Sequence, residues 1–121
     1  MKLLIIDDSK VMRAIVKKTL RQAGFGEAEI LEAANGAEGL SAVQEHQPDF
    51  VLSDWNMPEK TGIELLTDLR AMGNNTPFGF VTSESADDMK SRAMGAGALF
   101  LITKPFTPED FEKALRPHLA A

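Results

Sequence analysis

Four short apolar runs in this chain each stop at a residue with phosphate or metal chemistry. The runs cover 3–6, 50–53, 78–81 and 99–103, and the residues that follow or close them are Asp7 with Asp8, Asp54, Thr82 and Lys104. If helices separate the runs and the strands lie parallel, all these polar groups fall on one edge of one sheet, where small anionic ligands bind in open α/β folds. Three carboxylates, a hydroxyl and an ammonium in one pocket are the composition of a Mg²⁺-dependent phosphoryl-accepting site.

The adjacent acids Asp7 and Asp8 are unusual at the end of a buried strand. Desolvating paired carboxylates is costly unless a cation or hydrogen bonds compensate. Mg²⁺ prefers oxygen ligands and is usually held by one or two carboxylates plus phosphate oxygens, so Asp7, Asp8 and Asp54 suit it. With only two histidines and no cysteine in the chain, zinc is disfavoured. Helix capping is the alternative, and it accounts for one of the two acids rather than both.

Asp54, Thr82 and Lys104 each have an ordinary alternative. A carboxylate after a strand is a possible nucleophile toward a phosphoryl group, or simply an Asx-turn residue. A threonine at a strand end is a hydrogen-bond donor to phosphoryl oxygens, or a common β-branched strand residue. The lysine precedes Pro105, which fixes the backbone where an ammonium would offset phosphoryl charge, or it is a solvated strand-end side chain. The combined spacing favours the chemical interpretation.

Alternating strand and helix patterns predict an α/β domain with a parallel sheet. We expect strands at 2–7, 29–33, 49–53, 78–81 and 99–102, and helices at 9–23, 35–47, 61–73, 85–95 and 107–117. Capping residues support the helix starts, and they are Asn35 with Glu38, Thr61 with Glu64, Ser85, and Thr107 ahead of Pro108. Gly24 supplies the end of the first helix, and Pro117 is expected near the end of the last.

Length and composition limit the classes of function. A chain of 121 residues with 44% hydrophobic content is the size of one domain with its own core. The first apolar run is too short for a secretory signal or a membrane span, and the lack of cysteine fits a reducing compartment, so we expect a cytoplasmic protein. A formal net charge of −5 disfavours nucleic acid as a partner. The starting methionine and the last helix favour an entire protein.

Together these residues resemble a response-regulator receiver domain over nearly the full length of the chain. The segment Asp54-Trp55-Asn56-Met57-Pro58, with Lys104-Pro105-Phe106, is most similar to chemotaxis-type, CheY-like members. The resemblance implies a doubly wound (βα)5 fold of the flavodoxin-like, CheY-like type, with five parallel strands in the order 2-1-3-4-5. Residues 1–121 would form a single receiver domain with no output domain.

The resemblance also implies the role of each site residue. Asp54 would be the phosphoacceptor, and Mg²⁺ would be bound by Asp8, Asp54 and the backbone carbonyl of Asn56, with Asp7 acting through water. Thr82 matches the switch threonine of the family, and Lys104 matches the lysine that contacts the phosphoryl group. The Lys104-Pro105 peptide bond is expected to be cis.

A two-component phosphorelay function follows from this resemblance. The chain would take a phosphoryl group from the phosphohistidine of a sensor histidine kinase or a histidine phosphotransfer protein. It would then bind a separate target through the face formed by residues 85–95, 99–102 and 107–117. It would not be an enzyme, apart from catalysing its own phosphoryl transfer and slow autodephosphorylation. We also expect a monomer without membrane or nucleic-acid contacts.

One position departs from the family pattern. An aromatic residue usually lies three positions before the lysine and moves together with the threonine, but here that position is Leu101, with Phe100 beside it. Phe100 could substitute only if the last strand slipped by one residue, which would turn its side chain to the other face.

Two other functions remain open from the sequence. A Mg²⁺-dependent phosphohydrolase with an aspartyl nucleophile is one, although such haloacid dehalogenase-like proteins place the two acids two residues apart. A receiver-like module that is never phosphorylated is the other. The basic stripe of the first helix is either a solvated face or a docking face for an acidic partner helix, and its residues are Lys10, Arg13, Lys17 and Arg21.

Overall fold

The computed structural model describes residues 1–83 and 86–119, and its centre is a five-stranded parallel sheet. The strand order is β2-β1-β3-β4-β5, as the receiver resemblance predicts. The strands are β1 (Lys2–Ile6), β2 (Glu29–Ala33), β3 (Phe50–Ser53), β4 (Phe78–Thr82) and β5 (Leu101–Thr103). Their carboxyl ends meet at one edge, which is the edge that the polar residues were expected to share.

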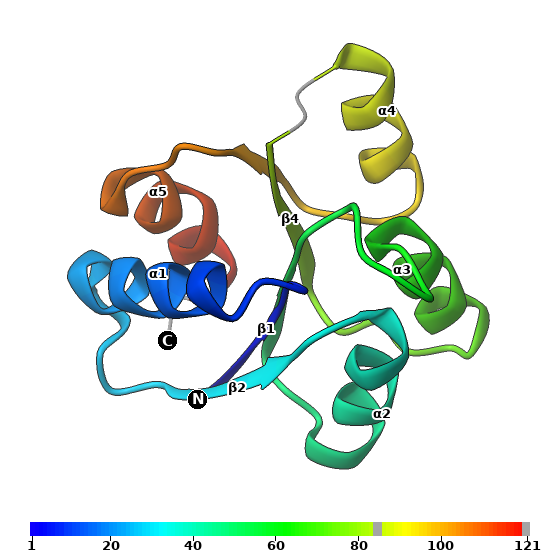
Figure 1. Ribbon diagram of the computed structural model, residues 1–121, viewed down its shortest axis with the longest axis horizontal. Coiled ribbons are helices and arrows are strands. Elements are labelled where there is room, and N and C mark those ends of the chain that lie inside the picture. The colour runs from blue at the N-terminus through cyan, green and yellow to red at the C-terminus, as the bar shows by residue number, and fades with distance from the viewer. Residues whose placement is uncertain (84–85, 120–121) are drawn as a thin grey trace.

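Helices cover both faces of the sheet. They are α1 (Lys10–Leu20), α2 (Gly36–His46), α3 (Gly62–Ala71), α4 (Asp87–Gly95) and α5 (Pro108–Leu119). Figure 1 shows α1 and α5 on one face and α2, α3 and α4 on the other. Within the described residues, no helix is long and apolar enough to cross a membrane.

The core consists of two apolar layers separated by the sheet. Successive residues of a strand point to opposite faces, so Leu3 and Ile5 pack under α1 and α5 while Leu4 and Ile6 pack under α2 and α3. All four residues are almost completely buried. Burial on both sides explains why the central strands β1, β3 and β4 are mainly apolar, with the polar site residues where these strands end, whereas the edge strand β2 carries Glu29 and Glu32.

The expected helix caps are present wherever the structure describes them. The Asn35 side chain accepts a hydrogen bond from the Glu38 N–H at 2.8 Å. Thr61 and Glu64 form a reciprocal capping box, and the hydrogen bonds from the Thr61 backbone and side chain hold the pKa of the Glu64 carboxyl below its usual range. Thr107 exchanges hydrogen bonds with Asp110 at the start of α5. The expected cap Ser85 lies outside the described residues.

Most element boundaries differ by one to three residues from the sequence-based expectation, and three of these differences have a structural cause. β5 begins at Leu101 rather than 99, although backbone hydrogen bonds already join residues 99 and 100 to β4. α1 stops at Leu20 and continues as a π-helical turn, η1 (Arg21–Phe25), in which Gly24 has a φ of 102°. α5 passes through Pro117 to Leu119, because a proline near a helix end removes a single N–H donor and Leu119 packs against the core.

Candidate functional site

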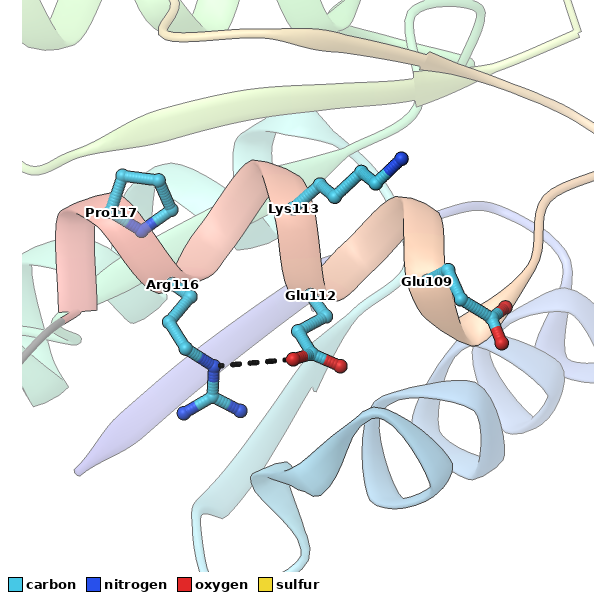
Figure 2. Close-up of a pocket in the computed structure, with 5 residues that line it drawn as sticks. All are labelled: Glu109, Glu112, Lys113, Arg116 and Pro117. Atoms are coloured by element: carbon cyan, nitrogen blue, oxygen red, sulfur yellow. Dashed lines mark ion pairs between the residues drawn. The ribbon is translucent and has the colours of Figure 1, made fainter.

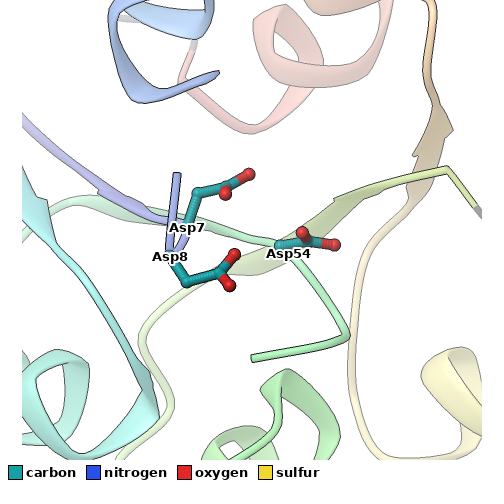
Figure 3. A group of neighbouring side chains, drawn as sticks. All are labelled: Asp7, Asp8 and Asp54. Carbon is teal, nitrogen blue, oxygen red and sulfur yellow. The ribbon is translucent and has the colours of Figure 1, made fainter. Parts of the chain in front are cut away.

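Three carboxylates gather at the carboxyl edge of the sheet. Asp7 and Asp8 follow β1, Asp54 follows β3, and one oxygen from each lies within 4.8 Å of the others (Figure 3). Asp7 is 4% exposed, Asp54 is partly buried and Asp8 is exposed. This oxygen-only donor set suits a hard divalent cation, so the residues fit the metal-binding role predicted for them.

Lys104 joins this acidic cluster from the loop after β5. Its Nζ lies 3.1 Å from Asp7 Oδ2 and 3.3 Å from Asp54 Oδ2. The lysine side chain is 16% exposed, so water screens these two ion pairs only partly. The Lys104-Pro105 peptide bond is cis, as expected. The structure therefore brings together the acidic pair, Asp54 and Lys104.

The loop after β3 holds Asp54 closely against the sheet. Asp54 Oδ1 accepts a hydrogen bond from the Trp55 N–H at 2.7 Å, and its backbone N–H donates to Ile6 O at 2.8 Å. A Cβ on Gly62 would collide with the Asp54 carbonyl and the Phe80 ring, so glycine is required where α3 starts against this loop. Sequence analysis missed Gly62, because nothing in its spacing separates it from other glycines that follow a cap.

Thr82 and Asn56 occupy positions consistent with the roles expected of them. Thr82 is completely buried at the end of β4, and its carbonyl accepts a hydrogen bond from the Lys104 N–H at 2.8 Å. Asn56 lies exposed in the loop two residues after Asp54. Their expected contacts, with a phosphoryl group and with a metal ion, stay predictions.

The last strand is not slipped, so Phe100 does not take the position of the missing aromatic residue. Leu101 pairs with Phe80 and Thr103 pairs with Thr82. Leu101 packs with the layer under α2, α3 and α4, whereas Phe100 stacks on Phe50 in the opposite layer, at 5.5 Å between ring centroids. An aliphatic side chain therefore fills the position of the family's aromatic residue.

Arg13 is not a member of a solvated stripe. Its side chain is 14% exposed, its Nε lies 3.0 Å from Glu32 Oε1, and its Nη1 donates to the Asp7 carbonyl at 2.7 Å. Lys10 and Arg21 are exposed, as a solvated face predicts. Sequence analysis missed the difference, because the partners of Arg13 lie on other elements.

A separate shallow pocket of about 620 Å³ lies along α5, away from the acidic cluster. Its described lining residues are Glu109, Glu112, Lys113, Arg116 and Pro117, and Figure 2 shows the ion pair between Glu112 and Arg116, at 3.8 Å. Both side chains of this pair are more than half exposed, and the two residues are separated by one helical turn. Such a pair is a surface feature of the helix, so the chemistry belongs to the edge of the sheet.

Comparison with known proteins identifies the family. The family model described as response regulator receiver domain matches residues 3–116. The chain belongs to the response regulator receiver family. The match covers the acidic cluster, Thr82 and Lys104, and it gives no support to the phosphohydrolase alternative.

Chemotaxis proteins are among the relatives of this receiver domain. It is 39% identical over 118 residues to a chemotaxis protein CheY homolog of Campylobacter jejuni, covering 95% of this chain and 89% of the relative. It is 37% identical to chemotaxis protein CheY1 of Helicobacter pylori, with 95% and 94% covered. The solved structure of chemotaxis protein CheY4 of Vibrio cholerae superposes with a TM-score of 0.85 at 36% identity, with 98% of each chain covered.

A receiver domain from another regulator superposes equally well. The receiver domain of response regulator 1452 of Francisella gives a TM-score of 0.86 at 26% identity, with 97% of this chain and 94% of that chain covered. The fold, the CheY-type receiver assignment and its place in two-component, chemotaxis-like signalling therefore agree with the sequence analysis.

Proposed function

We propose that Asp54 accepts a phosphoryl group from the phosphohistidine of a sensor histidine kinase or a histidine phosphotransfer protein. The observation that carries this proposal is the setting of the Asp54 carboxylate. It is 13% exposed and lies 3.3 Å from the Lys104 ammonium, and two further carboxylates lie beside it. A donor can therefore reach the carboxylate from solvent, and a cation lies where phosphoryl charge would develop.

In the transfer step, a carboxylate oxygen of Asp54 attacks the phosphorus in line with the phosphohistidine bond. The P–N bond breaks, its electron pair stays on the imidazole nitrogen, and that nitrogen takes a proton from solvent. The product is an aspartyl phosphate. The Trp55 N–H, which binds Asp54 Oδ1 at 2.7 Å, orients the carboxylate, and the Lys104 ammonium offsets charge on the transferring oxygens.

Mg²⁺ is the cofactor we propose for the acidic cluster. Asp8, Asp54 and the backbone carbonyl of Asn56 would hold it, with Asp7 acting through water. Mg²⁺ bound there would neutralise part of the charge on the phosphoryl oxygens. The oxygen ligands within 4.8 Å of one another support this choice, since hard cations with carboxylate and water ligands fit such a site.

The phosphorylated state would be transmitted by Thr82 to a separate target protein. A hydrogen bond from the Thr82 hydroxyl to the new phosphoryl oxygens would draw the end of β4 toward Asp54. This shift would favour the active conformation of the adjoining loop and α4. The proposed target surface is the face of α4, β5 and α5. A groove of about 460 Å³ lies on this face, and Leu101, Thr103 and Lys113 are among its lining residues.

The chain would act as a switch rather than as an enzyme with an external substrate. Water attacking the phosphorus would break the bond to the Asp54 oxygen, releasing inorganic phosphate and restoring the carboxylate. We propose that this slow step resets the signal, and that the protein works as a monomer in the cytoplasm.

Labelling with acetyl phosphate tests the acceptor assignment. In the presence of Mg²⁺, acetyl phosphate should change the fluorescence of Trp55, the one tryptophan of the chain, and add a phosphoryl group detectable by intact mass. Asp54→Ala should abolish both signals, whereas Asp88→Ala, which removes an exposed acid on α4, should keep them. A full response in Asp54→Ala would place the acceptor elsewhere, and release of phosphate without a stable label would favour a phosphatase.

A further inference from the structure

The side chain of Arg13 links three parts of the molecule at the acidic cluster. It starts from the first turns of α1, its Nη1 donates to the Asp7 carbonyl at 2.7 Å, and its Nε lies 3.0 Å from Glu32 Oε1 on β2. The planar guanidinium holds these two N–H groups in a fixed relation, which an ammonium cannot reproduce. Arg13 therefore connects the turn after β1 to the neighbouring strand.

All four polar atoms of Asp7 have a partner. Its N–H donates to Ala33 O at 3.1 Å, Oδ1 accepts from the Ser9 N–H at 2.9 Å, and Oδ2 pairs with the Lys104 ammonium at 3.1 Å. Arg13 supplies the partner of the carbonyl oxygen. Asp7 is 4% exposed, so loss of that donor would leave a poorly hydrated carbonyl.

The carbonyl of Asp7 also determines where Asp8 begins. The Asp7 C=O, the Asp8 N–H and the Asp8 Cα lie in one peptide plane, so a fixed carbonyl direction fixes the origin of the Asp8 side chain. Asp8 is exposed, and its carboxylate makes no hydrogen bond with the described residues. The backbone on its N-terminal side is thus what holds this carboxylate near Asp54.

We propose that Arg13 is a positioning residue for the acidic cluster, with Glu32 as its anchor. It acts through the Asp7 peptide group and orients the Asp7–Asp8 turn for cation binding, without touching the cation. The negative charge of Glu32 offsets the positive charge of the guanidinium. The arginine therefore orients the turn with little electrostatic repulsion of a bound cation. This inference rests on the proposed function, and in particular on Mg²⁺ binding at the cluster.

Mg²⁺ titration followed by Trp55 fluorescence measures the effect. Arg13→Ala should weaken Mg²⁺ binding by about tenfold, the lower end of what outer-shell partners contribute in metal sites. Arg13→Lys keeps the positive charge but loses the paired N–H groups of the guanidinium, and Glu32→Ala removes the carboxylate that anchors Arg13. Both variants should therefore show an intermediate loss of Mg²⁺ affinity. The Arg13→Ala, Glu32→Ala double variant should bind no more weakly than Arg13→Ala, because the two residues act as one unit.

Lys18→Ala is the matched control. It removes one positive charge from the exposed side of the same helix and should leave Mg²⁺ affinity unchanged. Arg13→Ala binding Mg²⁺ as tightly as the parent would overturn the proposal. If Asp8→Asn also bound Mg²⁺ as tightly as the parent, the metal site of the proposed function would fail as well. Loss in Asp8→Asn with no loss in Arg13→Ala would remove the Arg13 role alone.

Amide hydrogen exchange without metal provides a second measurement. Arg13→Ala should speed exchange of the Asp7 amide, which donates to Ala33 O, and of the Ser9 amide, which donates to Asp7 Oδ1. It should leave the Val51 amide of β3 as in the parent. Equal acceleration at Val51 would mean that the whole domain is destabilised, and the positioning role would then be rejected.

Discussion

At the scale of single residues, Lys104 holds two carboxylates that a metal ion would also use. Its ammonium pairs with Asp7 Oδ2 and Asp54 Oδ2 at 3.1 and 3.3 Å. A lysine at this distance stabilises the metal-free cluster and opposes a second positive charge there. The same ammonium would be attractive once phosphoryl oxygens arrive. Its contribution should therefore change sign between metal binding and signalling.

Lys104→Ala should separate these two effects. We expect Mg²⁺ affinity to be kept or to rise by up to about tenfold, because an ammonium that competes for the carboxylates is gone. Coupling to the active state should weaken, since no ammonium contacts the phosphoryl group. Trp55 fluorescence during a Mg²⁺ titration and then during acetyl phosphate addition measures both. Loss of Mg²⁺ binding would contradict the role assigned to Lys104.

The sequence was sufficient to predict which strand ends carry the site, but not how their neighbours support it. Asp7, Asp54 and Lys104 could be placed together because parallel strands bring their carboxyl ends to one edge. Arg13 could not be distinguished from Lys10 or Arg21, because the helical spacing is shared and the difference lies in contacts with Asp7 and Glu32. Contacts between distant parts of the chain have no signature in local spacing.

At the scale of elements, α4 contacts the acceptor loop through an arginine and an aromatic ring. The guanidinium carbon of Arg92 lies 5.4 Å from the centroid of the Trp55 ring, and Trp55 packs on Phe80 at 4.8 Å between ring centroids. Trp55 directly follows Asp54, and its N–H binds the Asp54 carboxylate. The Arg92–Trp55 contact therefore links α4 to the loop that carries Asp54. It involves an aromatic ring, whereas the family's usual aromatic position holds Leu101.

Arg92→Ala should change both stability and Trp55 emission. A cation–π contact at an exposed site is worth about 0.5–1 kcal/mol, so the free energy of unfolding should fall by that amount in urea denaturation. The emission of Trp55 should shift, because a charge above its ring is removed. Lys90→Ala removes an exposed charge from the same helix and is the control. Parent-like emission and stability in Arg92→Ala would show that the contact contributes nothing in solution.

Element types followed from periodicity, while some boundaries depended on packing. Asn35, Thr61 and Thr107 begin helices as expected, because a cap is a local interaction between residues three positions apart. The start of β5 at Leu101 and the passage of α5 through Pro117 depend on contacts with β4 and the core. No local pattern could reveal either.

At the scale of the whole molecule, the carboxylates that suit cation binding also destabilise the folded state. Three carboxylates have oxygens within 4.8 Å of one another in a chain whose net charge is already −5. When no metal ion is bound, the Lys104 ammonium offsets only part of their mutual repulsion, and the remainder destabilises the folded state. A bound cation reverses this effect and also stabilises by mass action. Thermal stability should therefore depend on Mg²⁺ through this one edge of the sheet.

Asp8→Asn should be more stable than the parent in a chelator and less responsive to Mg²⁺. Removing one charge from the cluster should raise the free energy of unfolding by about 1 kcal/mol, as relieved surface repulsion commonly does. The parent should gain about 2.7 kcal/mol when free Mg²⁺ is 100 times its dissociation constant, whereas Asp8→Asn should gain much less at that concentration. Thermal unfolding with chelator and with Mg²⁺ measures both differences.

Asp88→Asn changes the net charge equally but lies on α4, so it should keep the Mg²⁺ response of the parent. A chelator-treated Asp8→Asn that melts below the parent would mean that Asp8 contributes to the fold rather than straining it.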